Sequence, residues 1–283
     1  MHLKCVEREI SKKRAGEPEI TGKGLIMKEI RQQQCFAGAV GLCTIFALIA
    51  LIVGTLHAEP LSVLHVGQFS LAEAGGAYPD SWKPLTFDGI EAHTEYSLVE
   101  DDGTVVLKAE SMGSASGLTR EMTIDPVKYP IIEWRWKVEN VLENSDATRK
   151  SGDDYPARIY IAFEYDESKV GFFEKAKYEA ALLLHGKYPP LSAINYIWEN
   201  RIPVGTIVPN PYTSHVQMIV MESGPDKVGQ WVTESRNIYE DYRKAFGEDP
   251  PMISGVAVMT DTDNTKESAV AWFGDIAFRQ SPE

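Results

Sequence analysis

The sequence predicts a mostly β protein, folded as an antiparallel jelly-roll β-sandwich with two short helical inserts. About ten short segments alternate apolar and polar residues between turn-forming residues, which is typical of β-sandwiches. Strands and helices do not alternate regularly, which excludes a doubly wound α/β fold. The third observation is the stretch 252–278, which indicates a strand, an acidic loop expected at a rim, and a closing strand. Trp272 and Ile276 are expected on one face of that closing strand.

The first 58 residues are expected to lie outside this globule. Residues 36–56 form a run of 21 residues without a charged side chain, and Lys28 and Arg31 precede it. A basic flank, an apolar core and a small residue before Glu59 indicate a secretory signal peptide. An apolar helix of this length can also span a bilayer. We therefore expect an exported protein, either periplasmic or anchored to the inner membrane facing the periplasm, with one domain over 59–283.

Composition narrows the partners of that domain. Cys5, Cys35 and Cys43 all lie in the leader (1–58), so 59–283 holds no disulfide and no thiol nucleophile. The leader carries 8 of the 28 Lys+Arg and 5 of the 41 Asp+Glu, which leaves 20 against 36, a net charge of −16. A domain this acidic repels phosphate groups. We expect no nucleic-acid partner, and membrane contact only through the leader.

Hydrophobic periodicity places the elements in order. Apolar residues recur at helical spacing over 174–187 and 236–246, and Gly247 is expected to end the second helix. The segment around Trp134 and Trp136 is the most regular strand, with both rings on the core face. Strands are expected at 63–69, 94–99, 104–110, 118–124, 132–138, 157–163, 194–198, 216–222, 231–233, 252–259 and 270–278.

The acidic loop offers side-chain oxygens at every second residue, at Asp261, Asp263 and Thr265. A calcium loop begins in this way, although Lys266 stands where a helix-flanked calcium loop requires glycine. Three interpretations remain open. The loop could bind calcium as a cofactor in a site of another kind, form a turn whose side chains bond their own backbone, or contact a ligand directly, with Asn264 among the contacts.

A second acidic group precedes one of the strands. Asp153 and Asp154 could act as acid and base in glycoside cleavage, which needs two carboxylates about 5–9 Å apart. Alternatively, Arg158 pairs with one aspartate and fastens a loop. Arg236 and Asp241 are five residues apart and so do not form an i,i+4 helix pair, but either could reach the strand that carries Arg158.

Aromatic side chains are expected in or near several loops, where they could stack on sugar faces. These aromatic candidates are Tyr78, Trp82, Tyr196, Trp198 and Tyr212. Trp198 is the best single candidate, although a half-buried tryptophan is also common in a sandwich. The chain contains no HExxH zinc motif, no GxSxG nucleophile motif, no Walker loop and no GxGxxG. These enzyme classes are therefore not expected.

Several short motifs also occur together. Taken as a set they resemble an uncharacterised family of exported bacterial proteins, domain of unknown function 3047, over nearly all of 59–283. The resemblance implies a β-sandwich similar to carbohydrate-binding modules and brings no established activity or catalytic residues. The motifs are Trp134-Arg135-Trp136, Asp153-Asp154 with Arg158, Tyr196 with Trp198, Trp231 with Arg236, Asp241-Tyr242-Arg243, Asp261-Thr262-Asp263-Asn264-Thr265 and Gly274-Asp275-Ile276.

The resulting hypothesis is a non-catalytic binding module for a glycan or another cell-envelope component. One alternative is a hydrolase or lyase that acts on polysaccharide with the carboxylates of Asp153, Asp154 and Asp261. Another is a structural envelope protein. The binding hypothesis requires that Asp153, Arg158, Trp198 and Asp261 converge on one concave surface bordered by the acidic loop.

Overall fold

Two facing β-sheets build the part of the chain that the computed structural model describes, residues 62–169, 171, 175, 178, 182 and 190–281. The leader and most of the helix expected at 174–187 lie outside the described residues. Residues 61–283 form one compact unit. None of the helices within the described ranges is long and apolar enough to cross a bilayer.

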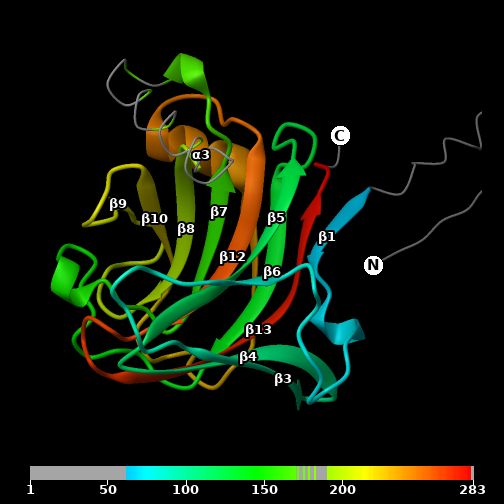
Figure 1. The fold of residues 1–283 in the computed structure, drawn as a ribbon, viewed down its shortest axis with the longest axis vertical. Helices are drawn as coiled ribbons and strands as arrows, with labels where there is room; N and C mark the ends of the chain where they lie inside the picture. The colour runs from blue at the N-terminus through cyan, green and yellow to red at the C-terminus, as the bar shows by residue number, and fades with distance from the viewer. Residues whose placement is uncertain are drawn as a thin grey trace, which may run out of the picture. The chain divides into compact units, whose positions relative to one another are not determined.

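The two sheets have six and seven strands (Figure 1). The six-stranded sheet runs in the order β11 (Val232–Asn237), β6 (Ile131–Val138), β13 (Ser268–Arg279), β4 (Thr104–Met112) and β3 (Glu95–Asp101), with β1 (Val63–Gly67) paired to β13. The seven-stranded sheet runs in the order β2 (Lys83–Leu85), β5 (Ala115–Ile124), β12 (Ile253–Asp261), β7 (Arg158–Phe163), β8 (Ser192–Glu199), β10 (Val216–Ser223) and β9 (Ile207–Pro209). Short 3-10 turns occupy Phe69–Leu71, Lys150–Gly152 and Glu167–Lys169.

The mostly β sandwich is confirmed, but one strand pair departs from the expected antiparallel arrangement. β8 and β10 are parallel, whereas β10 and β9 are antiparallel. The chain leaves β8, reverses through β9 and returns as β10 between them, so β8 and β10 share a direction. The two edge strands β2 and β9 were not expected from the sequence, because each has three residues and includes a proline.

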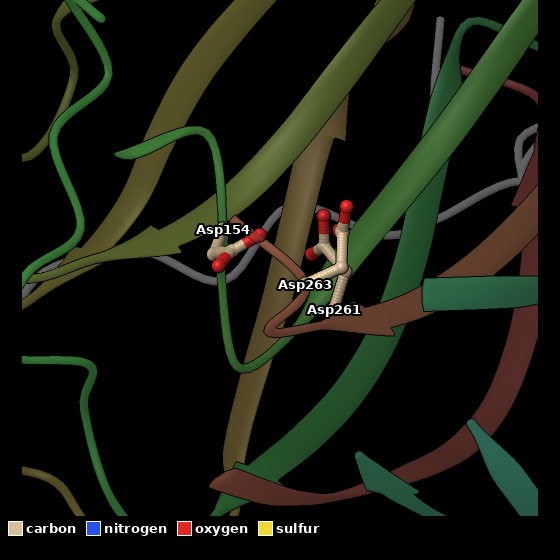
Figure 2. Close-up of side chains that lie close together, drawn as sticks. All are labelled: Asp154, Asp261 and Asp263. Atoms are coloured by element: carbon tan, nitrogen blue, oxygen red, sulfur yellow. The ribbon is translucent and has the colours of Figure 1, made fainter. Parts of the chain in front are cut away.

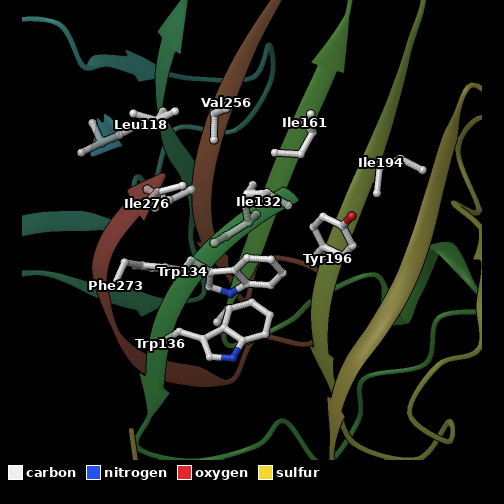
Figure 3. Packing of buried hydrophobic residues seen from close by; sticks show 14 of the residues in the cluster. Leu118, Ile132, Trp134, Trp136, Ile161, Ile194, Tyr196, Val256, Phe273 and Ile276 are labelled. Atoms are coloured by element: carbon white, nitrogen blue, oxygen red, sulfur yellow. The ribbon is translucent and has the colours of Figure 1, made fainter. Parts of the chain in front are cut away.

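The core fills the space between the sheets (Figure 3). Trp134 and Trp136 are 2% and 0% exposed, which confirms their expected core face. Their rings meet edge to face at 5.5 Å. Across the interface, Trp134 packs on Tyr196 at 5.0 Å and Trp136 packs on Trp198 at 6.0 Å. Aromatic contacts therefore join β6 of one sheet to β8 of the other.

In the closing strand β13, the alternation of core-facing and outward-facing residues changes partway along the strand. Its register against β6 shifts between Phe273 and Ile276, which marks a β-bulge. Phe273 and Ile276 consequently both point into the core, while Trp272 points outward beside Lys137. The expectation that Trp272 and Ile276 share a face was wrong, because the extra residue reverses the alternation.

Helix α3 (Ile238–Phe246) packs at one end of the sandwich. It begins later than expected because Arg236 belongs to β11, and the side chain of Asn237 caps it by accepting from the N–H of Glu240 at 3.0 Å. Gly247 ends it in the left-handed region with φ 78°, as expected. Tyr242 anchors the helix against Phe163, with the ring centroids 4.5 Å apart.

Candidate functional site

A groove of about 800 Å³ lies on the outer face of the seven-stranded sheet. Its floor consists of small side chains that point away from the core, because residues along a strand alternate between faces. Ala162 of β7 lies between Gly255 of β12 and Ala193 of β8 in the sheet register. Ala257 lies next to Thr119 of β5. Small residues at registered positions on four adjacent strands hollow the surface.

Two loops from opposite edges of this sheet form the groove walls. The end of β2 and the loop after it contribute Leu85, Phe87 and Ile90, and the loop between β9 and β10 contributes Tyr212 and Thr213. Phe87 and Tyr212 are 38% and 55% exposed. The groove follows β12 from Gly255 to Asp261, which is a span of about 20 Å at the usual strand rise. The shape suits a chain-like ligand that lies along the strands.

One end of the groove is charged and is built around Arg158, which is 1% exposed. Its Nε donates to Oδ1 of Asp261 at 2.7 Å, and its Nη2 donates to Oδ2 of the same carboxylate. Nη1 donates to the hydroxyl of Tyr160 at 3.0 Å and lies 3.5 Å from a carboxylate oxygen of Asp153. The ring of Tyr155 stacks on the guanidinium at 4.3 Å. This fork geometry fixes the Asp261 carboxylate by two charge-assisted hydrogen bonds.

Burial controls the electrostatics of this pair. It raises the pKa of the Asp261 carboxyl, and the nearby Asp154 and Asp153 add to the rise, while the guanidinium of Arg158 opposes it by stabilising the carboxylate. Burial lowers the pKa of Arg158, but the Asp261 carboxylate outweighs it and holds that pKa well above its ordinary value. The guanidinium is therefore always charged, and Asp261 depends on it for neutralisation.

Asp154 fastens the acidic loop to the segment before β7. One of its oxygens accepts from the backbone N–H of Asn264 at 3.3 Å and from the Asn264 side-chain amide at 3.1 Å. The other accepts from the backbone N–H of Thr265 at 2.6 Å. Tyr212 donates its hydroxyl to Asn264 at 2.9 Å, so the acidic loop is also linked to a groove wall.

Three carboxylates converge at this end: oxygens of Asp154, Asp261 and Asp263 lie within 4.8 Å of one another (Figure 2). The arrangement fits a calcium ion only in part. Both oxygens of Asp261 accept from Arg158 and both oxygens of Asp154 accept from the acidic loop, while calcium requires six to eight oxygens. The hydroxyl of Thr265 accepts from the N–H of Glu267 at 3.4 Å. Calcium at Asp261, Asp263 and Thr265 therefore remains a prediction.

Six of the residues singled out in the sequence border the groove, namely Asp153, Arg158, Tyr212, Asp261, Asp263 and Asn264. The acidic loop therefore lies at a hollow, as the binding hypothesis requires. We call Asp153, Asp154, Arg158, Asp261 and Asp263 together the charged end.

Four other candidates lie away from the groove. Tyr196 and Trp198 are each 0% exposed and point into the core. The expectation that Trp198 shares the concave surface was wrong, because Ile194, Tyr196 and Trp198 occupy the core face of β8. Asp241 accepts from Tyr196 at 2.8 Å and from Arg236 at 2.8 Å, with a second bond from the same guanidinium. Arg236 therefore pairs with Asp241 at helix α3 rather than reaching Arg158, since it precedes the helix.

Sequence reasoning missed most of the floor and walls. Phe87 lies in a loop without periodicity, so no pattern marked it. Ala162, Ala193 and Gly255 carry no chemical signal until the strand register places them side by side. Two signals were available: Tyr212 was predicted as a loop aromatic and does line the groove, and Tyr160, two residues from Arg158 on the same strand, shares its outward face.

The fold and this site define a β-sandwich protein with an elongated groove on the outer face of one sheet. The chain belongs to the family described as "Protein of unknown function (DUF3047)", whose sequence profile matches residues 80–277. This confirms the family resemblance seen in the motifs. A search of curated proteins finds no relative of the chain.

Solved structures with a similar arrangement include three sugar-related proteins. The carbohydrate recognition domain of Emp47p is 11% identical, with 81% of this chain and 100% of that chain covered and a TM-score of 0.39. Endoglucanase 3 of Trichoderma harzianum, from family GH12, is 10% identical over 80% and 100%, with a TM-score of 0.37. A family 30 carbohydrate-binding module of a Clostridium thermocellum cellulosomal cellulase is 8% identical over 79% and 100%, with a TM-score of 0.35.

Proposed function

We propose that this protein binds a glycan chain of the cell envelope along the groove without cleaving it. The observation that supports this proposal is the groove itself, with a floor of small residues, exposed Phe87 and Tyr212 on opposite walls, and polar groups gathered at one end. Pyranose rings present apolar C–H faces that pack on aromatic and aliphatic walls, while their hydroxyls need hydrogen-bonding partners. An open trough of this length accepts several linked units.

The contacts of the carboxylates favour binding over catalysis. Glycoside cleavage needs two carboxylic groups, one of them free to give or take a proton. Asp261 is held by both arms of Arg158, and both oxygens of Asp154 accept from the acidic loop. Asp153 accepts from the amide of Asn210 at 2.8 Å. Each is a structural acceptor already engaged, so the charged end serves to shape the groove and to orient a ligand.

The proposal is tested by filling the groove floor. Ala162→Leu places a larger side chain over Gly255 and Ala193, where there is room for it, so the fold is expected to remain stable. Isothermal titration of the full chain against a panel of soluble β-linked oligosaccharides is expected to show binding that this variant weakens by about tenfold or more. Thr233→Leu, on the exposed outer face of the six-stranded sheet, is the matched control. No heat from any sugar, or equal affinity in Ala162→Leu, overturns the proposal.

Export is part of the same proposal, because an envelope glycan lies outside the cytoplasm. The uncharged run at 36–56 supports it. Fractionation of cells expressing the full chain, with the mass of the recovered protein, separates the two forms of export. Cleavage near Ala58 is expected to give a periplasmic product, and an intact chain in the membrane fraction indicates an anchor. Recovery of the intact chain in the cytoplasm contradicts export.

A further inference from the structure

We infer that Tyr212 is the fixed contact of this groove, with its ring held in place to stack on the apolar face of one sugar unit, and that Asn210 and Asn264 are the residues that position it. This inference rests on the proposed function and deepens it, because it assigns the docking of the glycan to one wall of the groove.

The two exposed aromatic walls differ in how they are held. Phe87 is 38% exposed, and its ring makes no aromatic or cation contact within the described part of the chain. Tyr212 is more exposed, at 55%, yet both its backbone N–H and its hydroxyl are hydrogen-bonded. Burial does not account for this order, since more than half of the side chain faces solvent. The hydrogen bonds fix the orientation of a surface ring.

The backbone of Tyr212 is tied to the charged end. The loop between β9 and β10 begins with Asn210-Pro211-Tyr212, and the proline restricts φ in the middle of this turn. The side-chain oxygen of Asn210 accepts from the N–H of Tyr212 at 3.0 Å, and its amide nitrogen donates to Asp153 at 2.8 Å. Arg158 in turn donates to the backbone oxygen of Asp153. The position of the loop therefore depends on the same guanidinium that holds the charged end together.

The far end of the ring is tied to the acidic loop. The hydroxyl of Tyr212 donates to the amide oxygen of Asn264 at 2.9 Å and lies 3.2 Å from the backbone oxygen of Lys150. The amide nitrogen of Asn264 donates to Asp154 at 3.1 Å, which leaves the amide oxygen as the acceptor. A tyrosine has only two side-chain torsion angles. Holding both the backbone and the hydroxyl therefore fixes the plane of the ring.

One side of this ring is open towards the groove. The ammonium of Lys150 lies 5.0 Å from the ring centre, and Lys150 is not among the residues that line the groove, whereas Tyr212 is. The cation therefore covers the side away from the ligand. The C–H groups of a pyranose face pack on the electron-rich face of an aromatic ring. A ring that is oriented in advance loses little conformational freedom when a sugar stacks on it.

The test measures the affinity of the full chain for the β-1,4-linked glucose hexamer by isothermal titration. If that hexamer gives no heat, the β-linked oligosaccharide of the panel that binds most tightly takes its place. Tyr212→Ala is expected to weaken binding about tenfold, and Tyr212→Phe, which keeps the ring but loses the hydroxyl bond, about threefold. Tyr239→Phe removes a hydroxyl that donates to Asp249 at 2.9 Å from helix α3. This matched control is expected to keep full affinity.

Double variants distinguish positioning from direct contact. Asn264→Ala alone is expected to weaken binding about threefold, and to cause no further loss in the Tyr212→Phe protein, because the bond between the two side chains is already absent there. Asn210→Ala is expected to weaken binding in the natural protein but not in Tyr212→Ala. A residue that touches the sugar itself causes the same loss in both backgrounds. Thermal unfolding confirms that each variant is folded.

The outcomes separate the inference from the function on which it rests. Full affinity in Tyr212→Ala, with binding still weakened in Ala162→Leu, overturns the inference and leaves the proposed function in place. An undiminished loss from Asn264→Ala in the Tyr212→Phe protein, or from Asn210→Ala in the Tyr212→Ala protein, overturns the positioning role of that asparagine. Absence of binding to every sugar in the panel overturns the proposed function itself.

Discussion

The outer faces of the two sheets differ in the size of the side chains that cover them. On the six-stranded sheet, long side chains cover one another: Arg135 lies 4.5 Å from the ring centre of Trp231, and Lys137 lies 4.5 Å from that of Trp272. Lys137 also pairs with Asp101 at 2.5 Å, which ties the β3–β4 hairpin to β6. On the seven-stranded sheet the outward positions away from the charged end are small, at Ala162, Ala193, Gly255 and Ala257, and form the groove floor.

The difference shows where a sandwich can carry a ligand. On the outer face of the six-stranded sheet, the charged side chains already have partners in cation–π and ion-pair contacts. A ligand that binds there has to break these contacts. The second face has its polar groups concentrated at the charged end and leaves apolar floor beside them. Four changes test this contrast, from the largest expected effect to the smallest.

Arg158→Met removes the cation that neutralises the buried Asp261. It is expected to lower the free energy of unfolding by about 3–5 kcal/mol, because a buried carboxylate is left without its partner. Urea unfolding at neutral pH measures the loss. The double variant Arg158→Met with Asp261→Leu is expected to recover much of it, since both charges are then absent. A loss below about 1 kcal/mol in the single variant shows that the charged end is not held by this pair.

Lys137→Met makes the equivalent change on the other face. The side chains of Lys137 and Asp101 are 13% and 18% exposed, so Asp101 can be hydrated once the ammonium is gone. The expected loss is about 1 kcal/mol or less in the same urea experiment, and it shrinks with added salt. A loss as large as that of Arg158→Met means that the two faces do not differ in the way described.

Glu234→Gln examines the edge where the two sheets meet. Burial raises the pKa of Glu234 on β11 to about 7, and the charge of Glu222 on β10 contributes. A raised native pKa means that the folded state binds more protons, so stability is lost as the pH rises from about 4.5 through about 7. The variant is therefore expected to melt at a higher temperature than the natural protein at pH 8 and to lose this part of the pH dependence. Equal melting curves at pH 5 and pH 8 in both proteins contradict the assignment.

Phe87→Ala concerns ligand contact more than stability. Phe87 is exposed in a loop, so its removal is expected to change the free energy of unfolding by about 0.5 kcal/mol or less. It is also expected to weaken oligosaccharide binding by about fivefold, the effect of one lost aromatic contact of about 1 kcal/mol. Trp272→Ala on the opposite face should leave the affinity unchanged. Calorimetry on both variants distinguishes a wall of the groove from a general surface effect.

The sequence predicted the sandwich because alternation is strong in strands with one wet face, as at Trp134 and Trp136 in β6. It failed at β8, whose residues are buried on both faces: Ile197 joins a second small core with Met218 and Val220. Because neither face of β8 is exposed, the sequence did not show which face points into the main core. Tyr196 and Trp198 were therefore interpreted as ligand contacts, although they lie on the same face as Ile194.

The charged end and the loop aromatic Tyr212 were predictable from the sequence, and the rest of the groove was not. Asp153, Asp261 and Asn264 stand in short acidic clusters, which mark a rim. Phe87 and Tyr212 line the same groove because their loops adjoin β2 and β9, the two edges of one sheet, and strand order is a property of the whole fold. The bulge before Ile276 likewise depends on pairing with β6 rather than on local residue preference.

Asp241 has a mechanical consequence. Its carboxylate on helix α3 is bonded to Arg236 in the six-stranded sheet and to Tyr196 in the seven-stranded sheet. If one sheet slides over the other, at least one of these hydrogen bonds must lengthen. Asp241 therefore opposes relative movement of the two sheets. Tyr196 lies on the core face of the seven-stranded sheet and the groove on its outer face, so the Asp241 contacts hold the sheet that carries the groove from behind.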